Sequence, residues 1–562
     1  MHVKNKFLIV LILLTIIKIV LCCFLPNFYI ESYGYDDMLM MKLSDNISNG
    51  LWLGNYTDTT LVKGFFFPLF LSFLRLINIS SELGISLLYI IASITFCYVT
   101  RDLFKNRKIS YILYLILLFN PVTFSSETFQ RLYRYVLGPA QILFLLSFLY
   151  GIYKNSEIKK IIPHLIGLSL TYLSVIYTRE DYLFMNVLLL IMLILYIYKL
   201  KKKSLILIVF FIIVIPVNLL VTSLNQKYYG ASTNNEIINS NFSKAYQNLM
   251  KIKPDKNIYR VSIPKSSLNK AMKVSPTLET LKELINQNYK ESPDIKNGEL
   301  VDGYMIWSLR RVAYYKGAYK SFKTSEEFWG KVNEELEKAF QENKLEKRFT
   351  IPSAYISPPS PYNLKSFIKT LPKTIKYVLT YEDFITYDYN TLKNSDKSYI
   401  TKADESKVNY YPYYSLVIKT SNTNDLGTLT YKGVGGIFNI ITFAYQKISL
   451  IINTLGVICF IILLFSKNKK ILIPVLTLLT SVLLICGITY TDATSFEAIR
   501  YFYLAPVYIT LIIFSMTSIF ILWEDIQNGK IRTNYLVTMF KRRKKIFQIV
   551  YQKHVIFSRK II

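Results

Sequence analysis

Two adjacent carboxylates, Asp36 and Asp37, stand in the segment GYDDMLMMKL. Neighbouring negative charges raise the pKa of one member, which suits a carboxylate to take a proton from a hydroxyl as a general base. Successive residues of a helix point about 100° apart, so we expect only one of the pair to face a cavity. The structural alternative is that one aspartate caps a helix beginning near Met38 and the other is solvated.

Cationic side chains that suit a phosphate occur at four positions. Lys63 lies in VKGFFFPLF, Arg131 and Arg134 lie in ETFQRLYRYVLGP, and Arg500 lies in EAIRYFYLAP. Guanidinium groups bind phosphate oxygens bidentately and stay charged at any relevant pH. We predict that these four residues bind a phosphate; for any single arginine the alternative is anchoring to lipid headgroups.

The segment YTREDY at 177–182 adds further candidates. Arg179 either binds phosphate or pairs with Glu180 or Asp181 to close a helical bundle, and the structural role is favoured. Tyr501, directly after Arg500, is another candidate site residue.

Histidine and cysteine usage argues against a metal site built from histidine. The three histidines are far apart and offer no metal-ligand spacing. All five cysteines lie within or at the ends of apolar runs, where they suit a core. The stretch 225–435 contains none, so no disulfide framework supports it.

The elements that must position these residues are apolar helices. Hydrophobic residues make up 52% of the 562 residues, and the mean hydropathy is +0.29. A basic start and an apolar run to Leu25 predict an uncleaved first span, because the run is longer than a signal-peptide core. Later runs that can cross hydrocarbon about 30 Å thick predict about ten spans in all; they are 83–100, 109–124, 135–153, 161–177, 183–200, 205–224, 445–466, 471–490 and 502–523.

The run 64–79 decides the topology. Counting it as a span places the basic segment 101–108 outside and inverts every later basic loop. If it is an interfacial helix, the lysines within 154–160, 201–203, 467–470 and 541–545 all fall in the cytoplasm, as the positive-inside rule requires. Arg75 supports this choice, because a charge inside a lipid-facing span costs a few kcal/mol. We therefore predict a plasma-membrane protein with both termini cytoplasmic.

Most of the net charge of +30 then comes from cytoplasmic loops, where Lys and Arg set the orientation of the spans. Nucleic acid is not an expected partner. The tail 524–562, which holds KRRKK at 541–545, is predicted to lie in the cytoplasm along anionic membrane lipid.

The predicted fold class is an all-α polytopic membrane protein with a mostly helical extracytoplasmic domain between spans seven and eight. The N-terminal membrane region, 1–224, holds the first outer loop, 26–63, and the interfacial helix, 64–79. The domain, 225–435, is large enough to fold independently, and 436–523 forms the C-terminal membrane region. Periodicity predicts helices over 268–289, 304–319 and 325–346, and a short strand over 426–432. In this topology all candidate site residues lie at the outer face.

The order of these motifs resembles the C-type membrane glycosyltransferases, which include protein O-mannosyltransferases and lipid A aminoarabinose transferases. That family places an acidic pair in the first outer loop, similar to Asp36 and Asp37. A Lys-Pro-Pro-like start to an interfacial helix follows in the family; here Lys63 matches and Gly64 replaces the first proline.

Two later motifs are also similar. An arginine near the outer end of the third span is resembled by Arg131 or Arg134, and an Arg-Tyr pair before a late span by Arg500 and Tyr501. The resemblance covers roughly 1–220 and 440–525. It departs from the family at the large domain, which these relatives carry after the membrane core.

The resemblance implies an inverting transferase that moves a sugar from a polyprenyl-phosphate donor to an acceptor in the cell envelope. Lys63, Arg131 or Arg134, and Arg500 are expected to hold the donor phosphate, and Asp36 or Asp37 to deprotonate the acceptor hydroxyl. No nucleotide-sugar site is required. A divalent metal is left open, because oligosaccharide-transferring relatives use one and the mannosyl and aminoarabinosyl relatives do not.

Other functions remain possible alternatives. A transporter of lipid or polysaccharide typically has charged or helix-breaking residues near the bilayer midplane, and only Lys18, His164 and Pro216 come near this pattern. A polymerase or ligase of surface polysaccharide shares the outer location and the arginines. A catalytically inactive scaffold that presents the outer domain is a further alternative.

Overall fold

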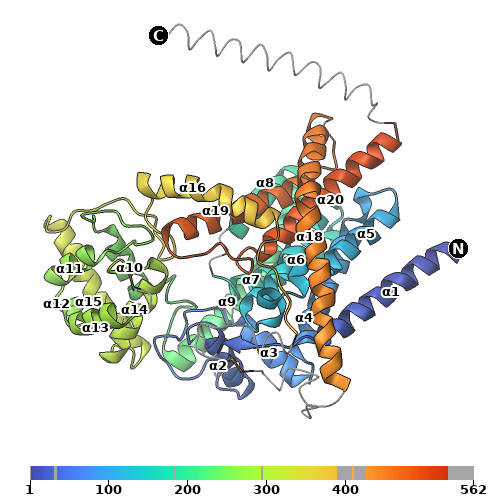
Figure 1. Ribbon diagram of the computed structural model, residues 1–562. Coiled ribbons are helices and arrows are strands. Elements are labelled where there is room, and N and C mark those ends of the chain that lie inside the picture. Colours follow the sequence, from blue (N-terminus) through green and yellow to red (C-terminus); the bar gives the residue numbers. More distant parts are fainter. Residues whose placement is uncertain are drawn as a thin grey trace, which may run out of the picture.

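The computed structural model describes residues 2–30, 34–180, 182, 184–292, 295–388, 408–409, 426–466 and 468–529. Asp181, Lys467 and the basic segment 541–545 lie outside the described residues. The chain is mostly helical, and a bundle of long helices has a lobe of shorter helices at one side (Figure 1).

The bundle is built from the predicted apolar runs. Such helices satisfy every backbone polar group internally, as a lipid environment requires. Their bounds are α1 (His2–Cys23), α4 (Ser81–Val99), α5 (Arg107–Leu118), α6 (Gly138–Lys154), α7 (Ile158–Ile176), α8 (Phe184–Leu200), α9 (Ile208–Tyr229), α18 (Leu426–Phe465), α19 (Leu472–Thr494) and α20 (Ala505–Gln527).

Within the described part of the chain, six helical segments are long and apolar enough to cross a membrane, which agrees with a multi-pass membrane protein. They are Ser81–Leu103, Arg134–Lys154, Phe184–Tyr229, Gly433–Phe465, Leu472–Thr494 and Ala505–Gln527. The segment Phe184–Tyr229 contains both α8 and α9, joined by the 3-10 helix Lys201–Leu207.

The run 64–79 forms a helix that is too short to cross a membrane. This helix, α3 (Phe66–Leu76), has 11 residues, so it is only about 16 Å long against about 30 Å of hydrocarbon. Both of its ends lie at the same end of the bundle. The Phe66 N–H donates to the Tyr177 carbonyl at 2.8 Å, and Ser81, just beyond α3, accepts a bond from Asn27 at 2.6 Å.

The basic loops gather at the opposite end, which we call the basic end (101–108, 154–160, 199–203 and 468–470). Lys154 pairs with Asp102 at 3.1 Å, and Lys203 donates to the Ser156 carbonyl at 3.4 Å. Lys470 contacts the Leu103 carbonyl. Three loops that are distant in sequence therefore share one end with 101–108, as the charge pattern predicts.

The lobe comprises α10 (Asn241–Lys251), α11 (Lys265–Val274), α12 (Pro276–Glu279), α13 (Lys282–Glu291), α14 (Asp302–Tyr315) and α15 (Phe322–Gln341), with the short antiparallel pair β2 (Ile295–Lys296) and β3 (Glu299–Leu300). The predicted helix 268–289 is interrupted. Ser275 accepts a cap bond from Leu278 N–H, and Pro276 follows it, so one helix ends and another begins.

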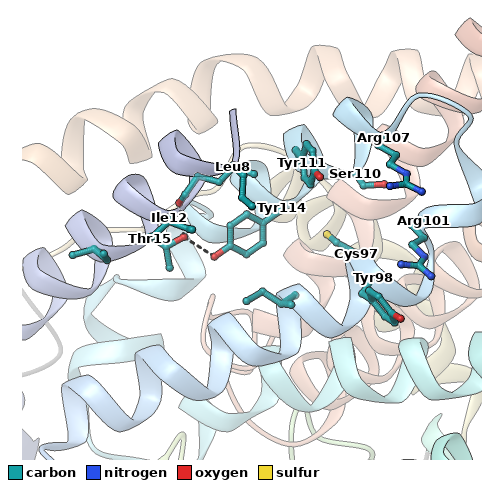
Figure 2. Close-up of a pocket in the computed structure, with 13 residues that line it drawn as sticks. Leu8, Ile12, Thr15, Cys97, Tyr98, Arg101, Arg107, Ser110, Tyr111 and Tyr114 are labelled. Atoms are coloured by element: carbon teal, nitrogen blue, oxygen red, sulfur yellow. Dashed lines mark hydrogen bonds between the residues drawn. The ribbon is translucent and has the colours of Figure 1, made fainter. Parts of the chain in front are cut away.

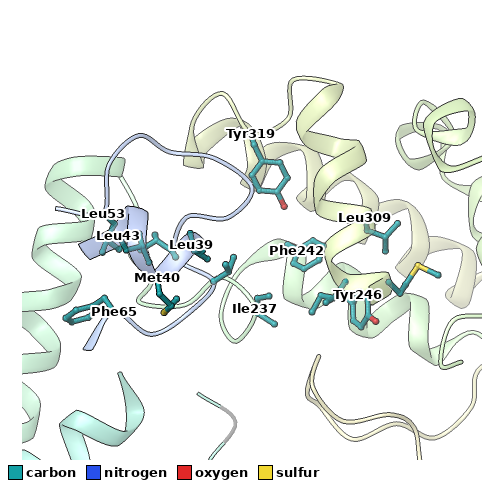
Figure 3. Packing of buried hydrophobic residues seen from close by; sticks show 14 of the residues in the cluster. Leu39, Met40, Leu43, Leu53, Phe65, Ile237, Phe242, Tyr246, Leu309 and Tyr319 are labelled. Carbon is teal, nitrogen blue, oxygen red and sulfur yellow. The ribbon is translucent and has the colours of Figure 1, made fainter. Parts of the chain in front are cut away.

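The lobe does not have a core of its own. Its buried apolar residues form one cluster with those of the first predicted outer loop and of α2 (Asp37–Ser48), which lies in that loop. Figure 3 shows Leu39, Met40 and Leu43 of α2 facing Ile237 and Phe242 of the lobe side. The first loop and the lobe are therefore packed as one body.

The region after the lobe departs from the predictions in two ways. A helix that was not predicted, α16 (Pro361–Leu379), packs against α19. The predicted strand 426–432 is wrong, because these residues begin α18, which also crosses the predicted boundary at 435. The β-branched and aromatic residues there favour a strand locally, and continuity with a long apolar helix overrides that preference. The only strand pair near the first loop, within the described residues, joins β1 (Tyr29–Ile30) to β4 (Val408–Asn409).

Candidate functional site

Most of the candidate residues meet at the lobe end of the bundle, brought there by three segments. Asp36 and Asp37 stand at the start of α2, Lys63 precedes α3, and Arg131 and Arg134 lie in the irregular segment 120–137 between α5 and α6. That segment begins where Asn120 caps a turn that starts at Pro121, and it contains the π-helix Ser126–Gln130. Its buried backbone is satisfied by bonds to the first loop: Phe28 donates to the Gln130 carbonyl at 2.9 Å and accepts from Leu132 at 2.8 Å.

Asp36 is held by a buried ammonium and a buried phenol. Lys63 Nζ contacts Asp36 Oδ1, and Tyr133 donates its hydroxyl to the same oxygen at 2.7 Å. Lys63 also donates to the Tyr133 hydroxyl at 3.0 Å. The side chain of Asp36 is 44% exposed, whereas that of Lys63 is 4% exposed. Asp36 precedes α2 but makes no side-chain cap bond, so its carboxylate is directed to Lys63 instead.

The surroundings of this pair act on both pKa values. Burial raises the pKa of Asp36, but the charge of Lys63 and the hydrogen bonds from Lys63 and Tyr133 outweigh it and hold that pKa well below its usual range. Burial lowers the pKa of Lys63, and Arg134 adds to this effect, while Asp36 opposes it. With Lys63 in place, Asp36 is an ionised but weak base.

Asp37 has a different environment from its neighbour. It is fully buried and accepts two bonds from Arg131, from Nε at 2.9 Å and from Nη2 at 2.6 Å, and a third from the Ile30 N–H at 3.0 Å. Arg131 also pairs with Glu127 at 2.7 Å. This arrangement joins the first loop to the segment 120–137, so Asp37 is a structural partner and Asp36 is the aspartate that faces solvent.

The segment at 177–182 supplies a second buried pair. Arg134 pairs with Glu180 at 2.7 Å and donates to the Thr178 carbonyl at 3.1 Å. Arg179 is 3% exposed, and its guanidinium lies over the rings of Tyr135 at 4.7 Å and Tyr182 at 4.8 Å.

The last predicted pair, Arg500 and Tyr501, has two roles. Tyr501 shares a hydrogen bond of 2.6 Å with Ser126 and accepts one from the Glu127 N–H at 2.9 Å, so it supports the segment that carries Arg131. Arg500 pairs with Glu497 at 3.2 Å, and the side chain of Glu497 is 54% exposed.

All four predicted phosphate ligands are already paired with carboxylates, Arg500 with Glu497. Lys63 engages Asp36, Arg131 engages Asp37 and Arg134 engages Glu180. An incoming phosphate must therefore compete with a carboxylate. Lys63 and Arg500 are the most readily transferred, because their partners Asp36 and Glu497 are about half-exposed and can be solvated when the cation leaves.

A tryptophan from the lobe completes the site, and the sequence carries no pattern that would have found it. The ring of Trp307, in α14, lies 5.4 Å from Lys63 Nζ and 5.2 Å from the ring of Tyr35. The next turn of α14 places Arg311 against the Tyr35 hydroxyl at 2.6 Å and Asp58 at 3.1 Å. The lobe thus forms one wall of the Asp36 site.

An apolar hollow with a volume of about 410 Å³ is joined to this group through the side chain of Arg179. Arg179 lines it together with Phe184 of α8, Leu484 and Ile488 of α19, and Tyr355. From Arg179 the aromatic contacts continue through Tyr135 and Tyr133, whose rings are 4.7 Å apart, to Asp36.

No group of three His, Cys, Asp or Glu side chains that could hold a metal ion occurs in the described ranges. The carboxylates nearest Asp36 each engage a cation instead. Comparison of the chain with protein-family models, curated proteins and solved structures finds no match.

Proposed function

We propose that the chain is a glycosyltransferase that moves a sugar from a polyprenyl-phosphate donor to an acceptor of the cell envelope. In this proposal it crosses the plasma membrane about ten times, with the basic end in the cytoplasm and the lobe outside. The observation that carries it is a half-exposed carboxylate, Asp36, held by the buried ammonium of Lys63 at the lobe end of the bundle.

The hollow suits the lipid chain of such a donor. Its walls from α8 and α19 are apolar, and the buried cation Arg179 stands at its edge. A polyprenyl chain lying between Phe184 and Leu484 brings its phosphate to Arg179, and the ring contacts of Tyr135 and Tyr133 lead from there to Lys63. Arg179 thus joins Lys63 as a phosphate ligand in this proposal.

Binding of the donor activates the base. When Lys63 turns from Asp36 to the phosphate, the main interaction that lowers the pKa of Asp36 is lost, so its carboxylate becomes a stronger base. Asp36 takes the proton of the acceptor hydroxyl while the acceptor oxygen bonds to the anomeric carbon. The bond from that carbon to the phosphate oxygen breaks, and its electron pair leaves with polyprenyl phosphate, whose charge Lys63 stabilises.

The wall formed by the lobe suits a carbohydrate. Trp307 and Tyr35 present aromatic surface beside Lys63 and Asp36, and aromatic side chains combine a large apolar face with a polar edge. We assign this surface to the transferred sugar or to the acceptor.

Substitution of Asp36 by asparagine tests the proposal. General-base catalysis contributes about 10²–10⁴-fold, so cells carrying Asp36→Asn in place of the native chain should lose the surface glycan and accumulate lipid-linked sugar. Both are measured by mass spectrometry of envelope extracts. Asp45→Asn is the matched control, because Asp45 lies on the same helix, is half-exposed and pairs only weakly with Arg75 at 3.2 Å. An unchanged glycan profile in Asp36→Asn, at normal protein level, would contradict the proposal.

A further inference from the structure

A second recess lies at the basic end of the bundle, between α1, α4 and α5 (Figure 2). Its volume of about 430 Å³ falls within the range of ligand pockets, about 300–1,000 Å³. We call it the α1–α4–α5 groove. It is far from Asp36: α4 begins beside the first loop at Ser81, and the groove lies against its other end at Cys97 and Tyr98, about 25 Å further along the helix at 1.5 Å per residue.

The two ends of the groove differ in chemistry. One end is apolar, with Leu8 and Ile12 of α1 and Ile94 of α4. At the other end Figure 2 shows Arg101, Arg107 and Ser110 together. The groove therefore has an apolar channel and a cationic head.

The cationic head is built for an acceptor of hydrogen bonds. The Arg101 guanidinium lies 4.1 Å over the centre of the Tyr98 ring, which fixes its plane at the mouth. Arg107 begins α5, so its charge adds to the positive end of the helix dipole. Ser110, one turn later, is 7% exposed, and its buried hydroxyl has no hydrogen-bond partner in the described structure. A buried hydroxyl without a partner is destabilising, and a ligand oxygen in the groove would satisfy it.

We propose that the α1–α4–α5 groove binds an anionic glycerophospholipid from the leaflet at the basic end. One acyl chain lies along Leu8, Ile12 and Ile94, the phosphate lies between Arg101 and Arg107, and Ser110 donates its hydroxyl to an ester or phosphate oxygen. Two guanidiniums beside an apolar channel complement one negative charge joined to a hydrocarbon chain. The inference is independent of sugar transfer, since the groove and the Asp36 site lie at opposite ends of α4.

Native mass spectrometry of the full chain tests this binding. The protein is extracted in mild detergent, washed, and exposed to phosphatidylglycerol and phosphatidylcholine with identical acyl chains. The wild-type chain should retain phosphatidylglycerol in preference to phosphatidylcholine. The double variant Arg101→Gln/Arg107→Gln should lose about thirtyfold in phosphatidylglycerol affinity, since each of the two basic residues near a lipid surface contributes about 1 kcal/mol and about 1.4 kcal/mol is tenfold.

Two control variants separate this site from general basicity and from general lipid contact. Lys159→Gln/Lys160→Gln removes two exposed charges from the start of α7, at the same end of the bundle but outside the groove, and should leave binding unchanged. Ile94→Trp fills the channel and should reduce binding, whereas Ile91→Trp, on an exposed face of α4 outside the groove, should not. Equal retention of both lipids by the wild-type chain would overturn the proposal, as would full retention of phosphatidylglycerol by the double arginine variant or by Ile94→Trp.

Discussion

Replacing each aspartate of the adjacent pair by asparagine should separate stability from activity. Asp37→Asn removes a charge at a site that is 0% exposed, where the carboxylate accepts two bonds from Arg131 and one from Ile30. The asparagine side chain has one oxygen and one NH₂ group, so its NH₂ group must face a donor of Arg131 or the Ile30 N–H. Glu127 then remains as a carboxylate partner of Arg131.

The expected magnitude follows from this burial. Breaking a buried ion pair from one side costs about 3–5 kcal/mol, and we expect about 3 kcal/mol because Glu127 remains. With an unfolding entropy of about 2.1 cal/mol/K per residue, the 562 residues give about 1.2 kcal/mol/K, so this loss lowers the melting temperature by about 2.5 °C. Asp36→Asn should change it by less than about 1 °C, because Asp36 is half-exposed and the amide oxygen still accepts from Lys63 and Tyr133.

Intrinsic-fluorescence thermal unfolding of the two purified variants in the same detergent provides the measurement. Glycan transfer is then compared in cells that express each at equal level. We expect Asp36→Asn to be stable and inactive and Asp37→Asn to be unstable. Equal melting temperatures for the two variants would refute the assignment of Asp37 to the structural pair.

Three further predictions concern the lobe and the topology. Burial raises the pKa of Asp302, although hydrogen bonds from serine hydroxyls and from Tyr246 oppose this shift. The folded state therefore keeps the Asp302 proton after the unfolded state has lost it near pH 4. The free energy of unfolding should fall as the pH rises from there through the folded pKa. Asp302→Asn should flatten the dependence of melting temperature on pH above about pH 4. Arg310→Leu leaves Glu236 buried without its cation, so we expect a loss of about 3–5 kcal/mol and faster proteolysis of the lobe. A cysteine at Asn106 should resist impermeant maleimide in intact cells, whereas one at the exposed Asn343 of the lobe should react; labelling at Asn106 would contradict the proposed topology.

The bundle is the part of the fold that the sequence predicts well. The run 183–200 is α8, Phe184–Leu200, and the run 161–177 is α7, Ile158–Ile176, because an apolar run of this length has few alternatives to a helix. The run 109–124 ends earlier than predicted, at Leu118, since Asn120 and Pro121 start a new turn.

The site was predicted in part. The candidates Asp36, Asp37, Lys63 and Arg131 do come together. The loops that carry them lie at the same end of the bundle, so their charged side chains are close in space. Asp36 faces solvent and pairs with Lys63, whereas Asp37 is buried and pairs with Arg131. Lys63 and Arg131 come from different segments, so the spacing of residues in the sequence does not predict these pairs. Trp307 is more than two hundred residues from Lys63 in the chain. A single tryptophan in a lobe helix belongs to no motif, so its contact with Lys63 could not be predicted from the sequence.

The shared core of the first loop and the lobe has a consequence for biogenesis. Leu39 and Met40 are made long before Phe242, Leu309 and Tyr319, which belong to the same apolar cluster (Figure 3). At a synthesis rate of about 5–20 residues per second, the loop waits roughly 15–60 s for the lobe to emerge. During that interval α3 covers one side of α2, and the apolar residues that face the lobe stay uncovered until it arrives.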